Sequence, residues 1–272
     1  MNKKKNITLL LGIALVIIII GMCVVSFFYT PHVPYEMHAK DRFSMPTEEY
    51  LLGTDQFGRD ILSRIMISSR YALLVGIVSV FIGAMIGLII GSVAAFSNNI
   101  IQNIIMRFID GLMSFPGILL AMLFVAILGK GLWNSVLAIG IFMIPVYARL
   151  SYSLVLNQKN NLYVKAAKSY GAGNLRIIFK HIMPSILPNL ITQFSSSIGN
   201  AILVESSLSF LGLGIQPPDA SWGLMLSESR QFTLTNPFIA VFPGIALIIS
   251  LLGFNLIGDA LNDSLIKKKV SE

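Results

Sequence analysis

Few side chains in this 272-residue sequence are spaced for catalysis or metal binding. There is no G-x-x-x-x-G-K-[ST] phosphate loop, no H-E-x-x-H pair and no nucleophile elbow. His32, Glu36 and His38 could in principle hold a metal ion, but they lie in a proline-containing loop, and we interpret them as solvated. The single cysteine, Cys23, lies in an apolar run, which excludes a cysteine-based metal site. We therefore expect no catalysis, no metal and no cofactor in this chain.

One ionisable side chain, Glu205, falls deep inside a predicted membrane segment. A charge in that position is costly, so it is a candidate for function. Asn200 and Ser206 could face the same cavity, and we predict these three residues as substrate-pathway candidates. A hydrogen-bonded structural role, or a place near the outer interface, would explain Glu205 equally well. We interpret Arg107 and Asp110, near the cytoplasmic end of a span, as a packing or ion-pair feature.

The composition indicates a membrane protein. Hydrophobic residues make up 55% of the chain and charged residues 12%, whereas about a quarter of the residues are charged in soluble proteins. The net charge of +7 could suggest nucleic acid, but the basic residues lie in loops between apolar runs. Such a distribution is typical of the positive-inside rule. We therefore predict a lipid bilayer, and no nucleic acid, as the surroundings of this chain.

The apolar runs predict an all-α polytopic protein with six transmembrane helices. The predicted spans are residues 7–29, 71–96, 112–128, 135–156, 187–213 and 237–258. The first run is of spanning length, longer than a signal-peptide core, so we expect it to be retained. Of the 20 lysines and arginines, thirteen fall inside and seven outside if both termini are cytoplasmic. That bias favours this orientation.

We predict two parts in the chain. Residues 1–70 are expected to form the first transmembrane helix and an external loop with a short interfacial helix. Residues 71–272 are expected to form a five-helix core that carries a cytoplasmic loop at 157–186. In the second predicted span, small residues recur every fourth position, which predicts a strip where another helix approaches closely. They are Ser79, Gly83, Gly87 and Gly91.

The cytoplasmic loop reads as two short amphipathic helices with a glycine joint. Tyr163, Ala166, Ala167 and Tyr170 share one predicted helical face, and Leu175, Ile178, Phe179 and Ile182 share another. Gly171 suits a turn with positive φ, and Pro184 is expected to stop the second helix. The loop holds five basic residues and no acidic one. Either a partner protein or the membrane surface must cover these apolar faces.

The sequence K-A-A-K-S-Y-G, then nine residues, then H-I-M-P resembles the coupling loop of ABC importer permeases. Ala166, Ala167, Gly171 and Pro184 match that family's pattern in register. Three further blocks are similar to the second permease subunit of dipeptide, oligopeptide and nickel importers. They are L-G-T-D-Q-F-G-R-D-I-L-S-R at 52–64, M-R-F-I-D-G-L-M-S-F-P at 106–116 and S-L-S-F-L-G-L-G-I-Q-P-P-D-A-S-W-G-L-M-L at 207–226.

This resemblance implies a type I ABC importer permease core in the cell membrane that passes peptides, nickel or a related metal chelate inward. It implies a second homologous permease, two ATP-binding subunits and an extracytoplasmic binding protein as partners, with ATP and magnesium bound only in the ATPases. The residues that it assigns to ATPase coupling are Lys165, Ala166, Ala167, Gly171, His181 and Pro184. Lys165 departs from the glutamate that is usual in the family, which removes any salt bridge made by that glutamate.

A second hypothesis from a different class is a self-contained secondary transporter or channel for a small polar solute. Such a protein would show inverted repeats or ionisable residues in several spans. The sequence offers little of either beyond Glu205.

Overall fold

The computed structural model describes residues 3–271, and the side chains of residues 7–265. Within that range the regular secondary structure is helical, apart from one isolated β-bridge between Thr54 and Asp60. The long helices are α1 (Lys3–Ser26), α2 (Ile61–Phe96), α3 (Asn99–Met113), α4 (Gly117–Leu128), α5 (Leu132–Lys159), α8 (Met183–Phe210) and α10 (Phe238–Ser271). The short elements are η1 (Ala39–Asp41), α6 (Leu162–Ser169), α7 (Asn174–Arg176), the π-helix η2 (Ile177–Ile182), α9 (Trp222–Ser229) and η3 (Arg230–Phe232). The predicted all-α class is confirmed.

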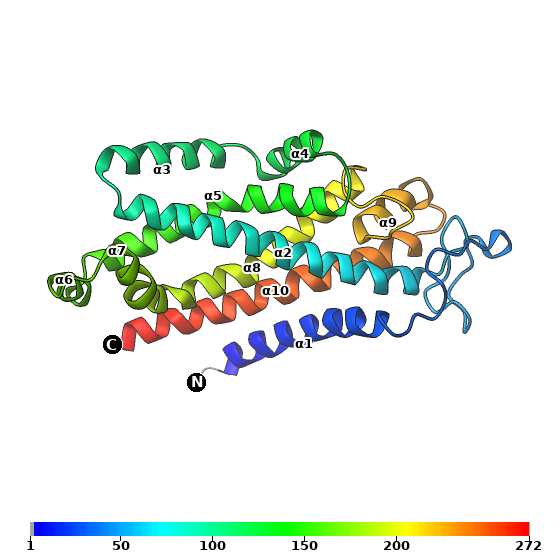
Figure 1. Cartoon of the computed structure of the whole chain (residues 1–272). Helices are drawn as coiled ribbons and strands as arrows, with labels where there is room; N and C mark the ends of the chain where they lie inside the picture. The colour runs from blue at the N-terminus through cyan, green and yellow to red at the C-terminus, as the bar shows by residue number, and fades with distance from the viewer. Residues whose placement is uncertain (1–2, 272) are drawn as a thin grey trace.

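The long helices lie roughly side by side, and the short elements gather at the two ends of the bundle (Figure 1). The α6 end carries α6, α7 and both ends of the chain. The α9 end carries α9 and the loop that joins α1 to α2. The terminal lysines used for the predicted orientation, Lys3–Lys5 and Lys267–Lys269, lie outside the residues whose side chains are described.

Four helices in the described range are long and apolar enough to span a membrane: α1 from Ile7, α2, α5, and α10 up to Leu265. A fifth crossing is available if α3 and α4 count as one, although they are bent by 94°. The predicted continuous third span over 112–128 is therefore wrong. Pro116 is the N-cap of α4, and proline disfavours helical backbone at the residue before it, so the helix breaks there.

Helix α8 covers most of the predicted fifth span and is 28 residues long. It falls outside the four apolar candidates because polar residues such as Asn189, Gln193 and Asn200 recur along it. A sixth crossing stays a prediction.

The predicted short interfacial helix is not a separate element. Its helical residues form the first turns of α2, which begins at Ile61 and continues unbroken to Phe96. Asp60 caps this helix, since its side chain accepts a hydrogen bond from the Ser63 backbone N–H. The expected amphipathic face is also absent here, because Arg64 is as buried as Ile61 and Ile65.

The small-residue strip on α2 packs directly against α5, as the sequence predicts. A Cβ placed on Gly87 would lie 2.6 Å from the Tyr147 Cβ, and one on Gly83 would lie 2.9 Å from the Gly140 carbonyl oxygen. Real Cβ atoms do not approach so closely, so the glycines set the separation of the two helix backbones. Tyr147 and its neighbour Met143 belong to the main hydrophobic core.

A second, smaller apolar cluster lies at the α6 end. It joins Val164 of α6 and Ile177 of η2 to Ala95 of α2, Val155 of α5 and Ile186 of α8. All five are at most 3% exposed. This cluster fixes the short elements of the loop to the ends of three long helices.

Candidate functional site

The segment from α6 to η2 forms a tight turn between α5 and α8 at the α6 end (Figure 1). Gly171 separates α6 from α7 and has a φ of +80°. A Cβ at this position would meet nothing within 4 Å. Glycine is thus favoured here by the left-handed backbone and not by a lack of space.

The residues predicted to couple to an ATPase differ in burial. Lys165, Ala166, Gly171 and Pro184 are exposed, and Ala167 and His181 are half-buried. Val164, which the predicted faces omitted, is the buried anchor of α6. The predicted face was built on Tyr163 and Tyr170, and Val164, which directly follows Tyr163, lies on a different side of the helix.

Pro184 does not stop a helix, so that prediction is wrong. It lies in the first turn of α8, and helical backbone runs through it from η2. The Met183 N–H bonds to the Ile178 carbonyl, five residues back. This wider π-turn directly before Pro184 makes room where an ordinary α-turn would place the proline ring against a carbonyl.

Large apolar side chains on the loop face outward. Tyr170 is 92% exposed, Leu175 72% and Phe179 66%. Ile178 and Ile182, predicted on the same face as Leu175 and Phe179, are instead buried. Four basic residues of the same loop are also exposed: Lys165, Lys168, Arg176 and Lys180. We call Tyr170, Leu175 and Phe179 with these four residues the basic–apolar surface.

The three predicted substrate-pathway residues on α8 do not share one cavity. Glu205 is 1% exposed and accepts hydrogen bonds from Ser209 Oγ at 2.6 Å and from Ser206 Oγ at 3.4 Å. Ser206 lines a mostly apolar pocket with Leu203 and Phe210, and Asn200 is exposed elsewhere on the helix. The contacts of Glu205 favour the structural alternative over the substrate role.

The other face of α8 carries the polar residues that lower its hydropathy. Asn189, Gln193 and Ser196 line a shallow pocket together with Asp259 and Asn262 of α10. Beside this pocket, Ser195 Oγ of α8 donates a hydrogen bond to the Phe254 carbonyl of α10 at 3.0 Å and links the two helices. Inside a membrane, a polar helix face needs water or a protein partner, since lipid cannot satisfy it.

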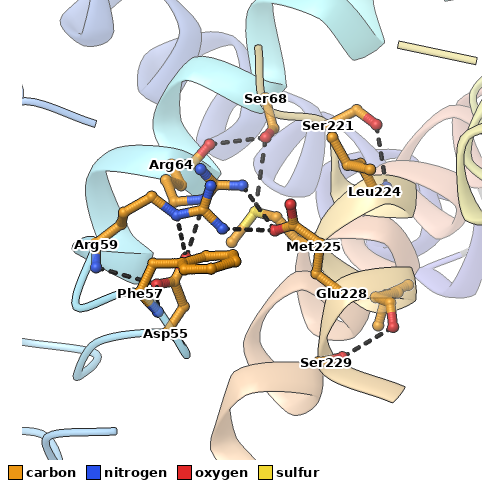
Figure 2. A network of polar contacts seen from close by, with 11 residues as sticks. Asp55, Phe57, Arg59, Arg64, Ser68, Ser221, Leu224, Met225, Glu228 and Ser229 are labelled. Carbon is orange, nitrogen blue, oxygen red and sulfur yellow. Dashed lines mark hydrogen bonds and ion pairs between the residues drawn. The ribbon is translucent and has the colours of Figure 1, made fainter. Parts of the chain in front are cut away.

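A buried ion-pair network dominates the α9 end (Figure 2). Arg59 pairs with Asp55 at 2.6 Å and with Glu228 at 2.7 Å. Arg64 lies 3.1 Å from Glu228 and 3.7 Å from Asp55. The side chains of Arg59, Arg64 and Asp55 are at most 5% exposed, and that of Glu228 is 18% exposed. Two cations and two anions therefore neutralise one another inside the protein.

This network joins two segments far apart in the sequence. The loop at 52–64 contacts α9, and the Trp222 indole N–H donates to the Ile65 carbonyl at 3.2 Å. Tyr71 also donates to Asp219 at 2.8 Å. Sequence reasoning singled out both segments but not their contact. The available signal was the pair of arginines in the block at 52–64 and Glu228, two residues beyond the block at 207–226, on the same predicted side of the membrane.

The histidines considered for metal binding lie apart. His32 stacks on Tyr50 and lies 3.6 Å from Asp60, whereas His38 lies 3.8 Å from Glu36. No group of three potential metal ligands forms in the part of the chain that the structure describes.

Asp110 forms an ion pair, but with a partner other than Arg107. It contacts Arg149 of α5, 39 residues along the chain. The prediction that Asp110 forms an ion pair is confirmed. The sequence pattern gave no indication that Arg149 is its partner.

Comparisons with known proteins agree with this geometry. Residues 83–271 match the profile of a family described as "Binding-protein-dependent transport system inner membrane component". The chain is 45% identical over 220 residues to a glutathione transport system permease protein, GsiD, of Pectobacterium atrosepticum, covering 81% of this chain and 73% of the relative. It is 39% identical over 268 residues to a dipeptide transport system permease protein, DppC, of Alkalihalophilus pseudofirmus, covering 98% and 88%.

Among solved structures, the fold is similar to a chain of the MetNI methionine ABC transporter in an inward-facing conformation. The TM-score is 0.58 at 18% sequence identity, over 71% of this chain and 92% of the other. At that identity the similarity concerns the fold alone.

Proposed function

Because the chain belongs to the family of binding-protein-dependent transport system inner membrane components, we propose that it forms part of the path by which an ATP-driven importer takes up short peptides. The protein is a permease component of an ABC transporter and resides in the inner membrane. It does not itself catalyse a reaction. The alternative of a self-contained secondary transporter is set aside by family membership.

Peptides are the substrate class that we propose. The two relatives described above are named for glutathione and for dipeptides, and both compounds are short peptides with free charged ends. The nickel or metal-chelate part of the predicted range has no support from them.

We propose that ATPase subunits dock on the basic–apolar surface. The supporting observation is that Tyr170, Leu175 and Phe179 are exposed while Val164 and Ile177 of the same segment are packed into the long helices. The exposed side chains can bind a partner, and the buried ones hold the loop to the long helices. A movement of the bound partner would therefore be transmitted to those helices. Helix α8 continues directly from η2, so a movement of the loop would also displace α8 and its polar face.

A second permease is the partner that we propose for that polar face. The proposal accounts for Asn189, Gln193 and Asn200 on α8, a helix that we propose as a membrane crossing. We also propose six crossings with both termini in the cytoplasm, counting α8 as one crossing and α3 with α4 as another. The position of both chain ends beside α6 supports an even number (Figure 1). The division at residue 70 stays a proposal, and α2 runs through it.

The test is uptake by the complete complex in proteoliposomes. The chain would be co-expressed with its second permease, ATPase subunits and binding protein, and uptake of labelled dipeptide, glutathione and Ni²⁺ would be measured. We expect uptake of at least one of the two peptides, dependent on ATP and on the binding protein. Uptake of neither peptide by the assembled complex would contradict the proposal, as would ATP-independent transport by this chain alone.

A further inference from the structure

The Asp110–Arg149 ion pair differs from every other arginine–carboxylate pair described in this chain in its exposure. Its two side chains are 50% and 54% exposed, whereas Arg59 and Arg64 at the α9 end are at most 5% exposed. Asp110 belongs to α3 and Arg149 to α5, so the pair bridges two helices.

The pair also lies deep along its helices. At 1.5 Å per residue, Asp110 is about 16 Å along α3 from Asn99, and Arg149 is about 15 Å along α5 from Lys159. Both of those helix ends lie at the α6 end (Figure 1). The pair therefore lies about three helical turns from those two helix ends. Half-exposed charges on the helices of a membrane protein face water or a protein partner, because lipid would not solvate them.

A polar pocket of about 310 Å³ surrounds the pair between α3 and α5. Gln102 and Asn103 of α3 and Ser153 and Asn157 of α5 line it together with the two charged residues. One wall is held in place, since Gln102 Nε2 donates to the Tyr152 hydroxyl at 2.7 Å. The volume is at the lower end of the range for small-molecule sites, about 300–1,000 Å³. It suits a ligand of two or three residues better than a long chain.

We propose that this pocket binds the charged ends of a short zwitterionic peptide during its passage, with Arg149 holding the carboxylate and Asp110 the ammonium group. The inference rests on the peptide function proposed above. The two residues would exchange their mutual pair for two pairs with the ligand, so the net charge in the pocket stays zero throughout. Guanidinium and carboxylate match in a two-pronged geometry, and the amide side chains can bond the peptide unit between the ends.

The alternative role for the pair is a tie that holds α3 to the bundle. A substrate-based comparison separates the two roles. Uptake by the complete complex would be measured for a zwitterionic dipeptide and for its C-terminal amide, in the wild type and in Arg149→Gln. The binding protein's preference between the two peptides cancels when uptake by Arg149→Gln is divided by uptake by the wild type for each peptide, because the same binding protein serves both permeases.

If Arg149 holds the carboxylate, Arg149→Gln should lower uptake of the zwitterion by about tenfold or more, as expected for a lost charge-assisted hydrogen bond. Uptake of the amide should change much less. Equal losses of uptake for both peptides would mean that the ion pair only holds α3 to the bundle, and would overturn the proposal. Absence of peptide uptake by the wild type would instead contradict the function on which the proposal rests.

A second measurement needs no binding protein and no uptake. A cysteine introduced as Ser153→Cys, with Cys23→Ala, would be labelled with a soluble maleimide in the assembled permease–ATPase complex. The zwitterionic dipeptide should slow this labelling severalfold, and Arg149→Gln should remove the protection. Ser264→Cys, exposed on α10 and outside the pocket, is the matched control and should not be protected. An unchanged labelling rate at position 153 would overturn the proposal.

Discussion

Arg64 at the α9 end and Arg149 near the middle of the bundle both pair with carboxylates, but in opposite surroundings. Arg64 is 1% exposed and shares two acids with Arg59. Arg149 is about half exposed and has a single acidic partner. Trp222, near Arg64, is buried, whereas Tyr170 at the α6 end is 92% exposed.

The difference indicates how the two ends work. At the α9 end, Arg59 and Arg64 pair with Asp55 and Glu228 within the chain, which fixes the loop at 52–64 against α9. At the α6 end the side chains of Tyr170, Leu175 and Phe179 are exposed, and in the pocket between α3 and α5 the paired side chains of Asp110 and Arg149 are half exposed. Those groups are available to an ATPase subunit and to a passing substrate, in line with the functions proposed above.

The largest effect is expected from Glu228→Ala at the α9 end. The substitution leaves Arg59 and Arg64 buried with only Asp55 as an acidic partner. Removing one member of a buried pair costs about 3–5 kcal/mol. The free energy of unfolding, measured in mixed SDS micelles, should fall by that order. Glu48→Ala, at an exposed acid in the loop between α1 and α2 that also holds Asp55, is the control, and an equal loss of unfolding free energy in both variants would contradict the role of the network.

A smaller effect on stability, but a large one on transport, is expected from Gly171→Val. A β-branched residue at a φ of +80° is strained by about 1–2 kcal/mol. The turn should shift, so ATP hydrolysis should continue while dipeptide uptake falls. Gly173→Val is the matched control, because Gly173 has a φ of −71° and open space around its Cβ position. Normal uptake by Gly171→Val would argue against the coupling role.

Removal of an exposed apolar side chain should leave stability almost unchanged at either end, but should affect assembly at only one. Phe179→Ser at the α6 end should change the free energy of unfolding by less than about 0.5 kcal/mol and still reduce co-purification of the ATPase subunits. Leu234→Ser, at a fully exposed residue near the α9 end, should leave co-purification intact. An equal loss of ATPase co-purification in both variants would contradict the proposal that only the α6 end binds the ATPase subunits.

The smallest effect is expected from Lys165→Glu, which introduces the residue usual in the family. Lys165 is exposed on α6, and exposed ion pairs contribute little. ATPase affinity, measured by titration in nanodiscs, should therefore change by less than about fivefold. A much larger change would mean that Lys165 is buried against an ATPase in the assembled complex.

Sequence patterns predicted what depends on local spacing. The small-residue strip around Gly87, the turn at Gly171 and the all-α class needed only periodicity and backbone preference. The same reasoning failed where tertiary packing overrode a local rule. Pro184 was expected to end a helix, but the π-turn of η2 accommodates it, and Pro116 broke a span that hydropathy alone made continuous.

The site residues were harder to place because their partners are distant in sequence. Glu228 meets Arg59 across 169 positions, and Asp110 meets Arg149 across 39. No periodicity encodes such contacts. Glu205 was selected for its charge in a span, yet its bonds to Ser206 and Ser209 lie within its own helix. Burial of a charge can indicate structure as well as function.

The most direct test of the contrast between the ends is cysteine labelling with and without the ATPase subunits. Phe179→Cys and Leu234→Cys would each be made with Cys23→Ala and treated with a soluble maleimide in nanodiscs. Assembly with the ATPases should slow labelling at position 179 by about tenfold or more, the effect expected for burial in an interface core, and leave position 234 unchanged. Equal labelling of position 179 in the presence and absence of the ATPases would contradict the account.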